Sequence, residues 1–370
     1  MNNENKKWKP PEKIEMLFEQ ALRGNAFSGI NRPTAGPRTS KELPRGTAPF
    51  QLYSLATPNG WKVGILLEEM GIEKPYPGLL PTFLLPNQDN ELVAITDSTP
   101  IIRRLEDESN KRSVIPTDSA LAFINYLLED FGDEWCTKYM FHYRWHAKED
   151  ADNAKGLLPF GMALNLPSEQ WRQMKEFIGK RQIDRLWVVG SNNTTAPIID
   201  ASYRRFLEIL EKHLEEMPFL LGHRPSSADF AIYGQLSQLV GFDPTPRAIA
   251  HKISPRTVAW VDLMEDQCGL EPSNEDWKNI GDLPESITEL LSELGQVYVP
   301  ALLANEKAIL DGEKTWESEI DGCKWKQQTF PYQAKCLKWI NEEFQSLSET
   351  DQARVKKLIS NTGCEFLIKN

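Results

Sequence analysis

The chain has 370 residues, of which 26% are charged and 40% are hydrophobic, as in ordinary globular proteins of two or three domains. Its formal net charge of −11 argues against nucleic acid and anionic membranes as partners, because phosphate groups are bound by clustered Lys and Arg. Five scattered cysteines without a CxxC pair indicate no disulfide framework and no metal site, so we expect reduced thiols and a cytoplasmic location.

Residues 1–48 form a polar segment that contains the stretch "FSGINRPTAGPRTSKELPRGTAPF". Its prolines argue against a continuous helix. It has no apolar run of the kind that a secretory signal needs, and no run in the chain approaches the ~18 apolar residues of a membrane span. We therefore expect an extended N-terminal arm and no membrane partner.

Residues 49–112 alternate between strand and helix signals. "FQLYSL" has the period of a strand, and residues 59–70 place apolar side chains at helical spacing. "PTFLL" and "ELVAI" follow as two strands joined by the turn "PNQDN". "TDSTPIIRRLEDE" then opens a helix, which either Asp97 or Ser98 can cap. The expected order is strand, helix, strand, strand, helix.

Residues 113–270 are expected to be almost entirely helical. The stretch "RPSSADF" carries a capping-box signal, in which Ser226 and Asp229 satisfy each other's backbone amides at a helix start. The periodicity of apolar residues predicts helices over 120–147, 168–186, 196–217, 226–240 and 256–267.

Residues 271–370 form a further, mainly helical unit. A helix is predicted over 286–310, with Pro300 as a break or a kink. Asp321 and Gly322 supply the positive φ angles of a type I′ turn between two alternating stretches, which predicts a β-hairpin. Two more helices are predicted in "YQAKCLKWINEEFQSL" and "TDQARVKKLIS".

Small polar residues stand where the first predicted strand turns into a helix. Thr57, Asn59 and Gly60 lie at the helix N-terminus, where unpaired amides and the helix dipole stabilise an anion such as a thiolate. No cysteine is present in this stretch, so a thiol would have to come from a ligand. The alternative is that Thr57 and Asn59 only cap the helix.

Two further positions extend this candidate site. A cis bond between Leu80 and Pro81 would present backbone polar groups to a ligand, whereas an ordinary trans turn is the alternative. Asp97 and Ser98 combine a carboxylate with an anion-binding helix start, which matches a zwitterion that has adjacent ammonium and carboxylate groups. The alternative is plain helix capping.

The order of these three signals along a small αβ unit resembles the glutathione S-transferase superfamily. The resemblance covers residues from about 27 to about 270 and includes "RPSSADF" in the helical part. It implies an α/β plus all-α fold, with a thioredoxin-like domain at 49–112, an all-helical domain at 113–270 and a helical extension at 271–370. It also implies a cis proline at Pro81 and a γ-glutamyl site at Asp97 and Ser98.

Two parts of the chain resemble different groups within this superfamily. "INRPTAG" and "FQLYSLATPNGWKV" are similar to the Nu class, which has disulfide-reductase and peroxidase activity. That resemblance implies that Thr57, Pro58 and Asn59 meet the glutathione sulfur and that Asn31 contributes to the site. "ITDSTPIIRRLE" and "EWCTKYMFHYRW" resemble instead a poorly characterised transferase-like group.

The segment that joins these two parts is short. Only the nine residues 72–80 separate Gly71 from Pro81. Nine extended residues span at most about 32 Å, which is enough to reach the next strand but leaves no room for both a strand and a helix. We therefore expect a truncated thioredoxin-like domain without its second strand and second helix.

The resemblance implies a glutathione-dependent transferase or a disulfide or peroxide reductase. Glutathione would be the co-substrate, Thr57 and Asn59 would activate its thiolate, and the acceptor would be a small electrophile, disulfide or hydroperoxide. Aromatic residues of 120–147 would line the acceptor pocket, and a homodimer is possible. The alternative function is a non-catalytic binding or scaffold protein with the same fold.

Other candidates have ordinary structural explanations. His142 and His146 lie four residues apart on a predicted helix and could share a metal, but the surrounding aromatic residues favour packing. Arg103 and Arg104 favour a solvated helix face over a substrate clamp. Cys136 is expected to be buried and inert.

Overall fold

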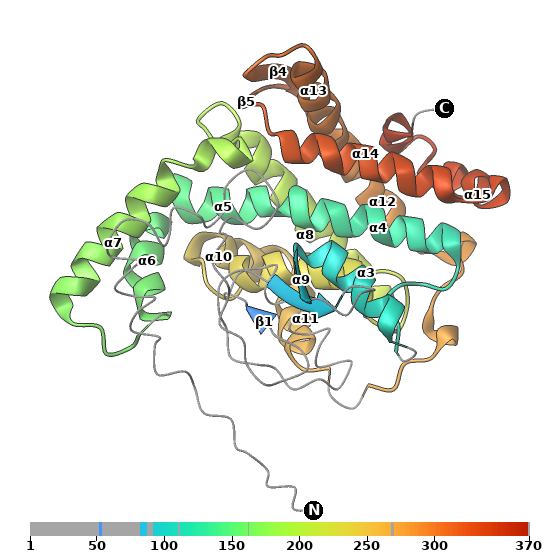
Figure 1. Ribbon diagram of the computed structural model, residues 1–370, viewed down its shortest axis with the longest axis horizontal. Coiled ribbons are helices and arrows are strands. Elements are labelled where there is room, and N and C mark those ends of the chain that lie inside the picture. The colour runs from blue at the N-terminus through green and yellow to red at the C-terminus, as the bar shows by residue number, and fades with distance from the viewer. Residues whose placement is uncertain are drawn as a thin grey trace, which may run out of the picture.

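The computed structural model of the protein describes residues 52–53, 82–86, 92–109, 112–161, 163–267 and 270–368. These residues form a small sheet beside a large helical body, and the last helices of the chain lie across the upper side of α4 (Figure 1). Within this part of the chain, no helix is long and apolar enough to cross a membrane.

A three-stranded antiparallel sheet lies in the N-terminal part. Its strands are β1 (Leu52–Tyr53), β2 (Thr82–Pro86) and β3 (Leu92–Thr96), in the order β1-β2-β3. Phe83 lies opposite both Leu52 and Ile95, so β2 is the central strand. The three predicted strands are confirmed. The helix predicted over 59–70 and the junction 72–80 fall outside the described residues.

Helix α3 (Ser98–Glu108) follows the sheet as predicted. Ile101, Ile102 and Leu105 repeat at helical spacing and are buried on one face. Phe83 and Leu85 alternate along β2 and are buried in the same hydrophobic core. This packing fixes α3 against the body of the molecule, and α3 carries the Asp97-Ser98 pair at its start.

The helical body contains eight α-helices between residues 119 and 265. Glycine at position 132 allows the closest contact between α4 and α9, because a Cβ atom there would lie 2.8 Å from Ala231 Cβ. The eight helices are α4 (Ser119–Glu134), α5 (Cys136–His146), α6 (Lys148–Leu157), α7 (Ser168–Ile183), α8 (Ala196–Glu216), α9 (Ser227–Leu239), α10 (Pro244–Ile253) and α11 (Pro255–Glu265).

The prediction of a single helix over 120–147 is wrong in one respect. The chain breaks at Trp135, which separates α4 from α5. Trp135 is fully buried, and its indole N–H donates to Tyr139 at 3.0 Å and to Ser202 of α8 at 3.2 Å. Helices α6 and α10 were not predicted. The break depends on partners distant in sequence, which local periodicity does not report.

The C-terminal part consists of helices and one hairpin. Its elements are α12 (Glu285–Glu293), a π-helical segment (Leu294–Tyr298), α13 (Val299–Leu310), β4 (Thr315–Ile320), β5 (Cys323–Gln328), α14 (Pro331–Ser346), α15 (Glu349–Ile359) and a final 3-10 turn (Cys364–Leu367). The predicted hairpin is confirmed, with Asp321 and Gly322 at φ values of 53° and 65°. Pro300 stands in the first turn of α13, directly after the π-helical segment.

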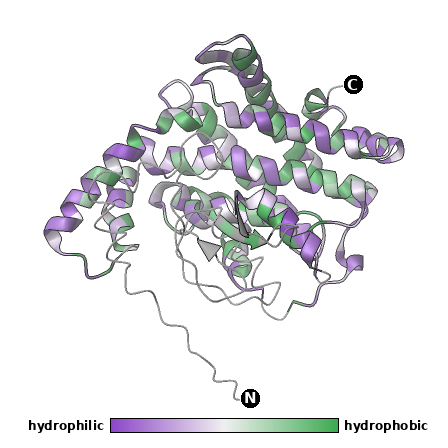
Figure 2. Cartoon of the chain, viewed as in Figure 1, coloured by the Kyte–Doolittle hydropathy of each residue, from purple (hydrophilic) through white to green (hydrophobic). Residues whose placement is uncertain are grey.

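Residues of the C-terminal part share the core of the helical body. Leu290 and Leu291 of α12, Leu337 and Ile340 of α14 and Val355 of α15 belong to one continuous cluster with residues of α4, α8 and α9. Figure 2 shows hydrophobic and hydrophilic residues side by side along α4, α14 and α15, as expected for helices with one buried face. One hydrophobic core contains residues from both sides of position 270. The division of the chain into four segments stays a prediction.

The capping box at the start of α9 gives a first testable prediction. Asp229 is fully buried, and its carboxylate accepts from the amides of Leu220 at 2.9 Å and Ser226 at 2.8 Å. Asp229→Ala leaves two buried amides without partners, which should lower the free energy of unfolding by about 2–4 kcal/mol. Urea denaturation measures this change.

A second capping box provides the matched control. Ser273 and Asp276 form the same motif at an exposed 3-10 turn. Asp276→Ala should cost less than about 1 kcal/mol, because water replaces the lost bonds. Equal losses for Asp229→Ala and Asp276→Ala would contradict the role that we assign to burial.

Candidate functional site

The structure describes two of the predicted site residues. Asp97 and Ser98 stand at the start of α3. The other six predicted site residues lie outside the described part of the chain, and their roles stay predictions; they are Asn31, Thr57, Pro58, Asn59, Leu80 and Pro81.

Asp97 is the N-cap of α3 and has a strained backbone. Its φ is 80° and its ψ is 135°, a region that residues other than glycine rarely adopt. One carboxylate oxygen accepts from the amide of Thr99 at 3.2 Å, and the other accepts from the hydroxyl of Tyr332. The cap that the sequence predicts is therefore confirmed. A strained backbone persists only where the surrounding structure holds it in place, and residues of this kind are enriched at ligand-binding sites.

Ser98 has an unusual hydrogen-bonding state. The residue is fully buried, yet its hydroxyl has no hydrogen-bond partner in the described structure. A buried hydroxyl without a partner costs roughly 1–3 kcal/mol, so such groups are rare unless a ligand completes them. The hydroxyl also lies at a helix N-terminus, where an anion is stabilised. Ser98 is therefore a candidate donor to an anionic group.

A buried carboxylate holds α3 in position beside this pair. Glu129 of α4 is 1% exposed and accepts from the Thr99 hydroxyl at 3.0 Å, from Arg103 at 2.9 Å and from the Ser227 hydroxyl at 2.6 Å. Asn125 donates to Ser227 at 2.7 Å. The network joins α3, α4 and α9, so it fixes the start of α3 relative to the helical body.

The two arginines of α3 have different surroundings. Burial alone would lower the pKa of Arg103, but its ion pair with Glu129 raises that pKa above the ordinary value. Arg103 thus belongs to the network behind the site, while its side chain remains 29% exposed. Arg104 pairs with Glu108 one turn along α3, where both side chains are about one-third exposed, in agreement with the prediction.

Carboxyl groups of α4 meet the C-terminal part next to Asp97. Asp130 accepts from the Tyr298 hydroxyl at 2.6 Å, and Glu134 accepts from the amide of Gln333 at 3.3 Å. Burial raises the pKa of Asp130 to about 7. Burial, together with the charges of Asp130, Asp133 and Asp97, raises the pKa of Glu134 to about 8. Both groups are therefore partly protonated near neutral pH.

The remaining candidates take structural roles. The Nδ1 atom of His142 and the hydroxyl of Ser191 share a hydrogen bond of 2.7 Å. The ring of His142 stacks on that of His146, with centroids 4.6 Å apart, and burial lowers the pKa of His142 to about 4. The described residues hold no group of three or more His, Cys, Asp or Glu that could bind a metal. Cys136 is buried as predicted, and burial raises the pKa of its thiol well above the ordinary value.

Three aromatic residues of 120–147 lie in the core. Trp135, Tyr139 and Tyr143 are at most 6% exposed, and Tyr139 and Tyr143 pack on Tyr203 of α8. The expectation that they form an acceptor pocket is therefore wrong for these residues. Their size and apolar surface place them in the core, where they exclude water.

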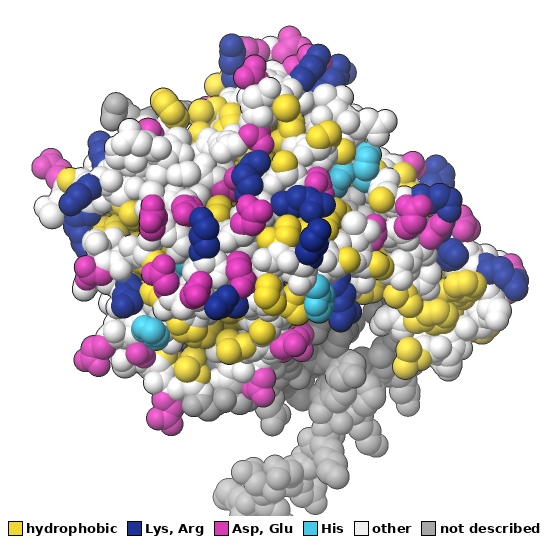
Figure 3. All heavy atoms as spheres, turned by 180° about the vertical axis from the view of Figure 1, so that it is seen from behind, with side chains coloured by type: hydrophobic (Ala, Val, Ile, Leu, Met, Phe, Trp, Pro, Cys, Tyr) yellow, Lys and Arg dark blue, Asp and Glu magenta, His cyan; other side chains and the backbone are white. Residues whose placement is uncertain are grey.

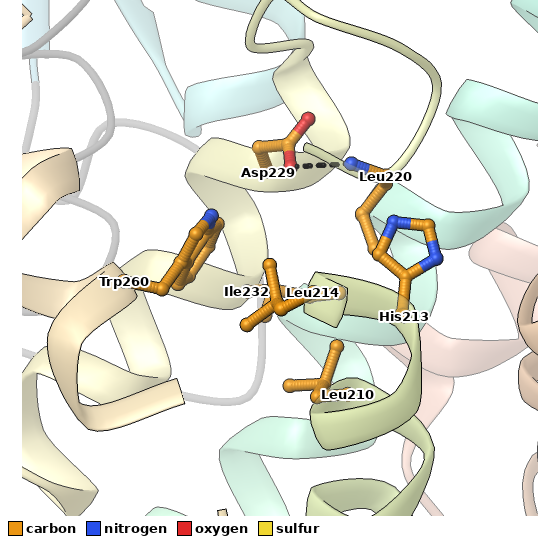
Figure 4. Close-up of a pocket in the computed structure, with 7 residues that line it drawn as sticks. All are labelled: Leu210, His213, Leu214, Leu220, Asp229, Ile232 and Trp260. Atoms are coloured by element: carbon orange, nitrogen blue, oxygen red, sulfur yellow. Dashed lines mark hydrogen bonds between the residues drawn. The ribbon is translucent and has the colours of Figure 1, made fainter. Parts of the chain in front are cut away.

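One cavity among the described residues is too small for a ligand. It lies between α8, α9 and α11 and has a volume of about 10 Å³, which is room for about one water molecule. Figure 4 shows that it is lined mainly by apolar side chains, with Asp229 turned toward the amide of Leu220. On the face seen in Figure 3, acidic and basic side chains are interspersed and form no field of one sign.

Sequence comparison places the helical body in a known family. Residues 188–271 match the family model described as "Glutathione S-transferase, C-terminal domain". An uncharacterized GST-like protein of Streptococcus mutans is 27% identical over 269 residues, which cover 69% of this chain and 92% of that protein. The chain is therefore similar to glutathione S-transferase-like proteins over about two thirds of its length.

Three further proteins are similar to parts of the chain. The glutathione S-transferase-like protein OpS6 of Beauveria bassiana is 26% identical over 229 residues, covering 59% of this chain and 91% of that protein. The disulfide-bond oxidoreductase YghU of Escherichia coli is 62% identical over 47 residues, which are 13% of this chain and 16% of that protein. A solved glutathione transferase YghU from Streptococcus pneumoniae, complexed with glutathione, is 24% identical, covers 65% of this chain and 88% of its own, and has a TM-score of 0.38.

Sequence reasoning missed one residue of the site, Tyr332. It lies 235 residues after Asp97 and reaches it only through the packing of α14 beside α4. No local pattern in "FPYQAKC" distinguishes Tyr332 from an ordinary residue in the first turn of a helix. Its contribution therefore becomes visible only in the tertiary structure.

The raised pKa of Glu134 gives a second testable prediction. Its folded-state pKa of about 8 exceeds the ordinary value of 4.5, so its contribution to stability is greatest below pH 4.5 and is lost as the pH rises toward 8. Glu134→Gln does not titrate. Its free energy of unfolding should therefore exceed that of the wild type increasingly from pH 5 to pH 8, by roughly 4 kcal/mol at the upper end.

Denaturant unfolding at several pH values tests this expectation. Exposed Glu349→Gln, at the start of α15, is the control and should follow the wild-type curve in parallel. A Glu134→Gln curve that also runs parallel to the wild type would show that Glu134 ionises normally in the folded protein.

Proposed function

We propose that the protein binds glutathione and uses its thiolate in a transferase reaction or in the reduction of a disulfide or peroxide. The observation that carries this proposal is the buried hydroxyl of Ser98, which has no partner among the described residues and lies beside the carboxylate of Asp97. The match of residues 188–271 to the C-terminal domain of glutathione S-transferases supports it, as does the similarity of 47 residues to the disulfide-bond oxidoreductase of E. coli.

The Asp97-Ser98 pair matches the γ-glutamyl end of glutathione. That end carries an ammonium group next to a carboxylate. Asp97 supplies a negative charge for the ammonium group, and the hydroxyl of Ser98 at the N-terminus of α3 supplies a donor for the carboxylate. A ligand carboxylate would accept a hydrogen bond from the Ser98 hydroxyl, which has no partner among the described residues.

Thr57 and Asn59 are proposed to bind the sulfur atom of glutathione. Hydrogen bonds from their side chains favour the charged form of a thiol and so lower its pKa. The thiolate attacks one sulfur of a disulfide, the other sulfur leaves as a thiolate, and a mixed disulfide remains.

The rest of the tripeptide is proposed to be lined by Asn31, Pro58, Leu80 and Pro81. A homodimer and a cytoplasmic location belong to the same proposal.

Ser98 gives a third testable prediction, which separates binding from folding. Because its hydroxyl has no hydrogen-bond partner among the described residues, Ser98→Ala should not lower the free energy of unfolding and should raise it by about 1–3 kcal/mol. The same change should weaken glutathione binding roughly five- to twentyfold, since a hydrogen bond to a charged group is lost. Calorimetric titration and urea denaturation measure the two effects.

Ser227→Ala is the matched contrast for Ser98→Ala. Ser227 is equally buried but donates to Glu129 at 2.6 Å, so its removal should destabilise the fold. No binding of millimolar glutathione to the wild-type protein would overturn the proposed function. Unchanged affinity in Ser98→Ala would remove Ser98 from the site.

Asn59 gives a fourth testable prediction, which concerns turnover. Asn59→Ala should reduce glutathione-dependent activity about ten- to hundredfold, because a donor to the thiolate is lost. Asn193→Ala, at an exposed position before the start of α8, is the control and should retain wild-type activity. Binding without any turnover in the wild type, with a panel of disulfides, hydroperoxides and electrophiles, would favour a non-catalytic binding protein.

A further inference from the structure

The C-terminal part of the chain supplies a residue to the candidate glutathione site. Tyr332 lies in the first turn of α14, and its hydroxyl donates to the Asp97 carboxylate. Figure 1 shows α14 running alongside α4 above α3. This contact joins the residues after 270 to the very carboxylate that is proposed to receive the ligand's ammonium group.

Tyr332 is itself held in place. Its ring packs against Phe330 at 6.2 Å and against Trp339 at 5.9 Å, measured between ring centroids. The neighbouring Gln333 binds Glu134 of α4 at 3.3 Å, which ties this turn of α14 to the helical body. Burial and the nearby charge of Asp97 raise the pKa of Tyr332, so its hydroxyl remains a donor at physiological pH.

Asp97 thereby receives one donor from each of two distant parts of the chain. The Thr99 amide holds one oxygen from within α3, and Tyr332 holds the other from α14. A carboxylate with one fixed oxygen can still rotate, whereas two donors fix its plane. An ionised carboxylate has about four acceptor positions, so a ligand's ammonium group can bind while both donors stay in place.

We propose that Tyr332 is a positioning residue of the glutathione site, which fixes the Asp97 carboxylate for the ligand's α-ammonium group. This inference rests on the proposed function. It assigns a role to the segment after residue 270, because α14 then completes the binding site. The physical basis is preorganisation, since a group that is already ordered does not lose that freedom when the ligand binds.

The test compares two Tyr→Phe variants of the full-length chain. Tyr332→Phe removes the hydroxyl that reaches Asp97. Tyr298→Phe is the matched control, because Tyr298 also comes from the C-terminal part and also donates to an aspartate of the same interface, Asp130, at 2.6 Å. Each protein is titrated with glutathione and with glutaryl-cysteinylglycine, which lacks only the α-amino group.

The expected result is selective. Tyr332→Phe should bind glutathione roughly five- to tenfold more weakly than the wild type and should bind the analogue without the amino group equally well. Tyr298→Phe should bind both ligands as the wild type does. In an Asp97→Asn background, Tyr332→Phe should have no further effect, since the carboxylate through which it acts is absent.

Several results would overturn the inference. One is that Tyr332→Phe binds glutathione as tightly as the wild type or more tightly. Another is that Tyr332→Phe loses affinity for glutathione and for the analogue to the same degree. If the wild type binds glutathione and Tyr332→Phe matches it, only this inference fails. If the wild type binds no glutathione, the proposed function fails and the inference fails with it.

Hydrogen exchange on the wild type provides an independent measurement, which does not depend on how well a variant folds. Glutathione should slow amide exchange in residues 331–346 more than the analogue does. Equal protection by the two ligands, or protection confined to α3, would contradict a link between the ammonium group and α14.

Discussion

The buried carboxylate of Glu129 is the interaction on which the candidate site depends. It accepts hydrogen bonds from α3 and α9 while belonging to α4, and the Arg103 guanidinium balances its charge. A buried charge is tolerated when its partners are complete, and removing one partner is costly. The network therefore favours one position of α3. That position determines where the strained backbone of Asp97 and the hydroxyl of Ser98 can meet a ligand.

The C-terminal part is integrated into this arrangement through two kinds of contact. Its apolar residues join the core of the helical body, and its tyrosine hydroxyls donate to aspartates of α3 and α4. Gly295 and Gly363 allow the final 3-10 turn to lie against the π-helical segment, because a Cβ atom at position 295 would lie 1.8 Å from the carbonyl oxygen of Thr362. The C-terminal part thus extends the hydrophobic core and also contacts Asp97.

Local signals in the sequence predicted much of the secondary structure. Alternating residues marked β1, two short runs joined by the turn "PNQDN" marked the strands at 82–86 and 92–96, the Asp321-Gly322 pair marked the hairpin, and the spacing of Ser226 and Asp229 marked the start of α9. The break at Trp135 was mispredicted, and the ion pair of Arg103 was not predicted. Both depend on partners far away in the sequence, and periodicity reports only which face of an element is apolar.

Local patterns in the sequence indicated the strands, the hairpin, the superfamily resemblance and the Asp97-Ser98 pair, because capping and periodicity act over three or four residues. The packing of the whole chain brings Asp97 to Tyr332 across 235 residues and buries Ser98, whose hydroxyl has no partner among the described residues. The same packing places Trp135, Tyr139 and Tyr143 in the core. Burial and long-range contacts arise from how all helices pack together, which no short stretch of sequence specifies.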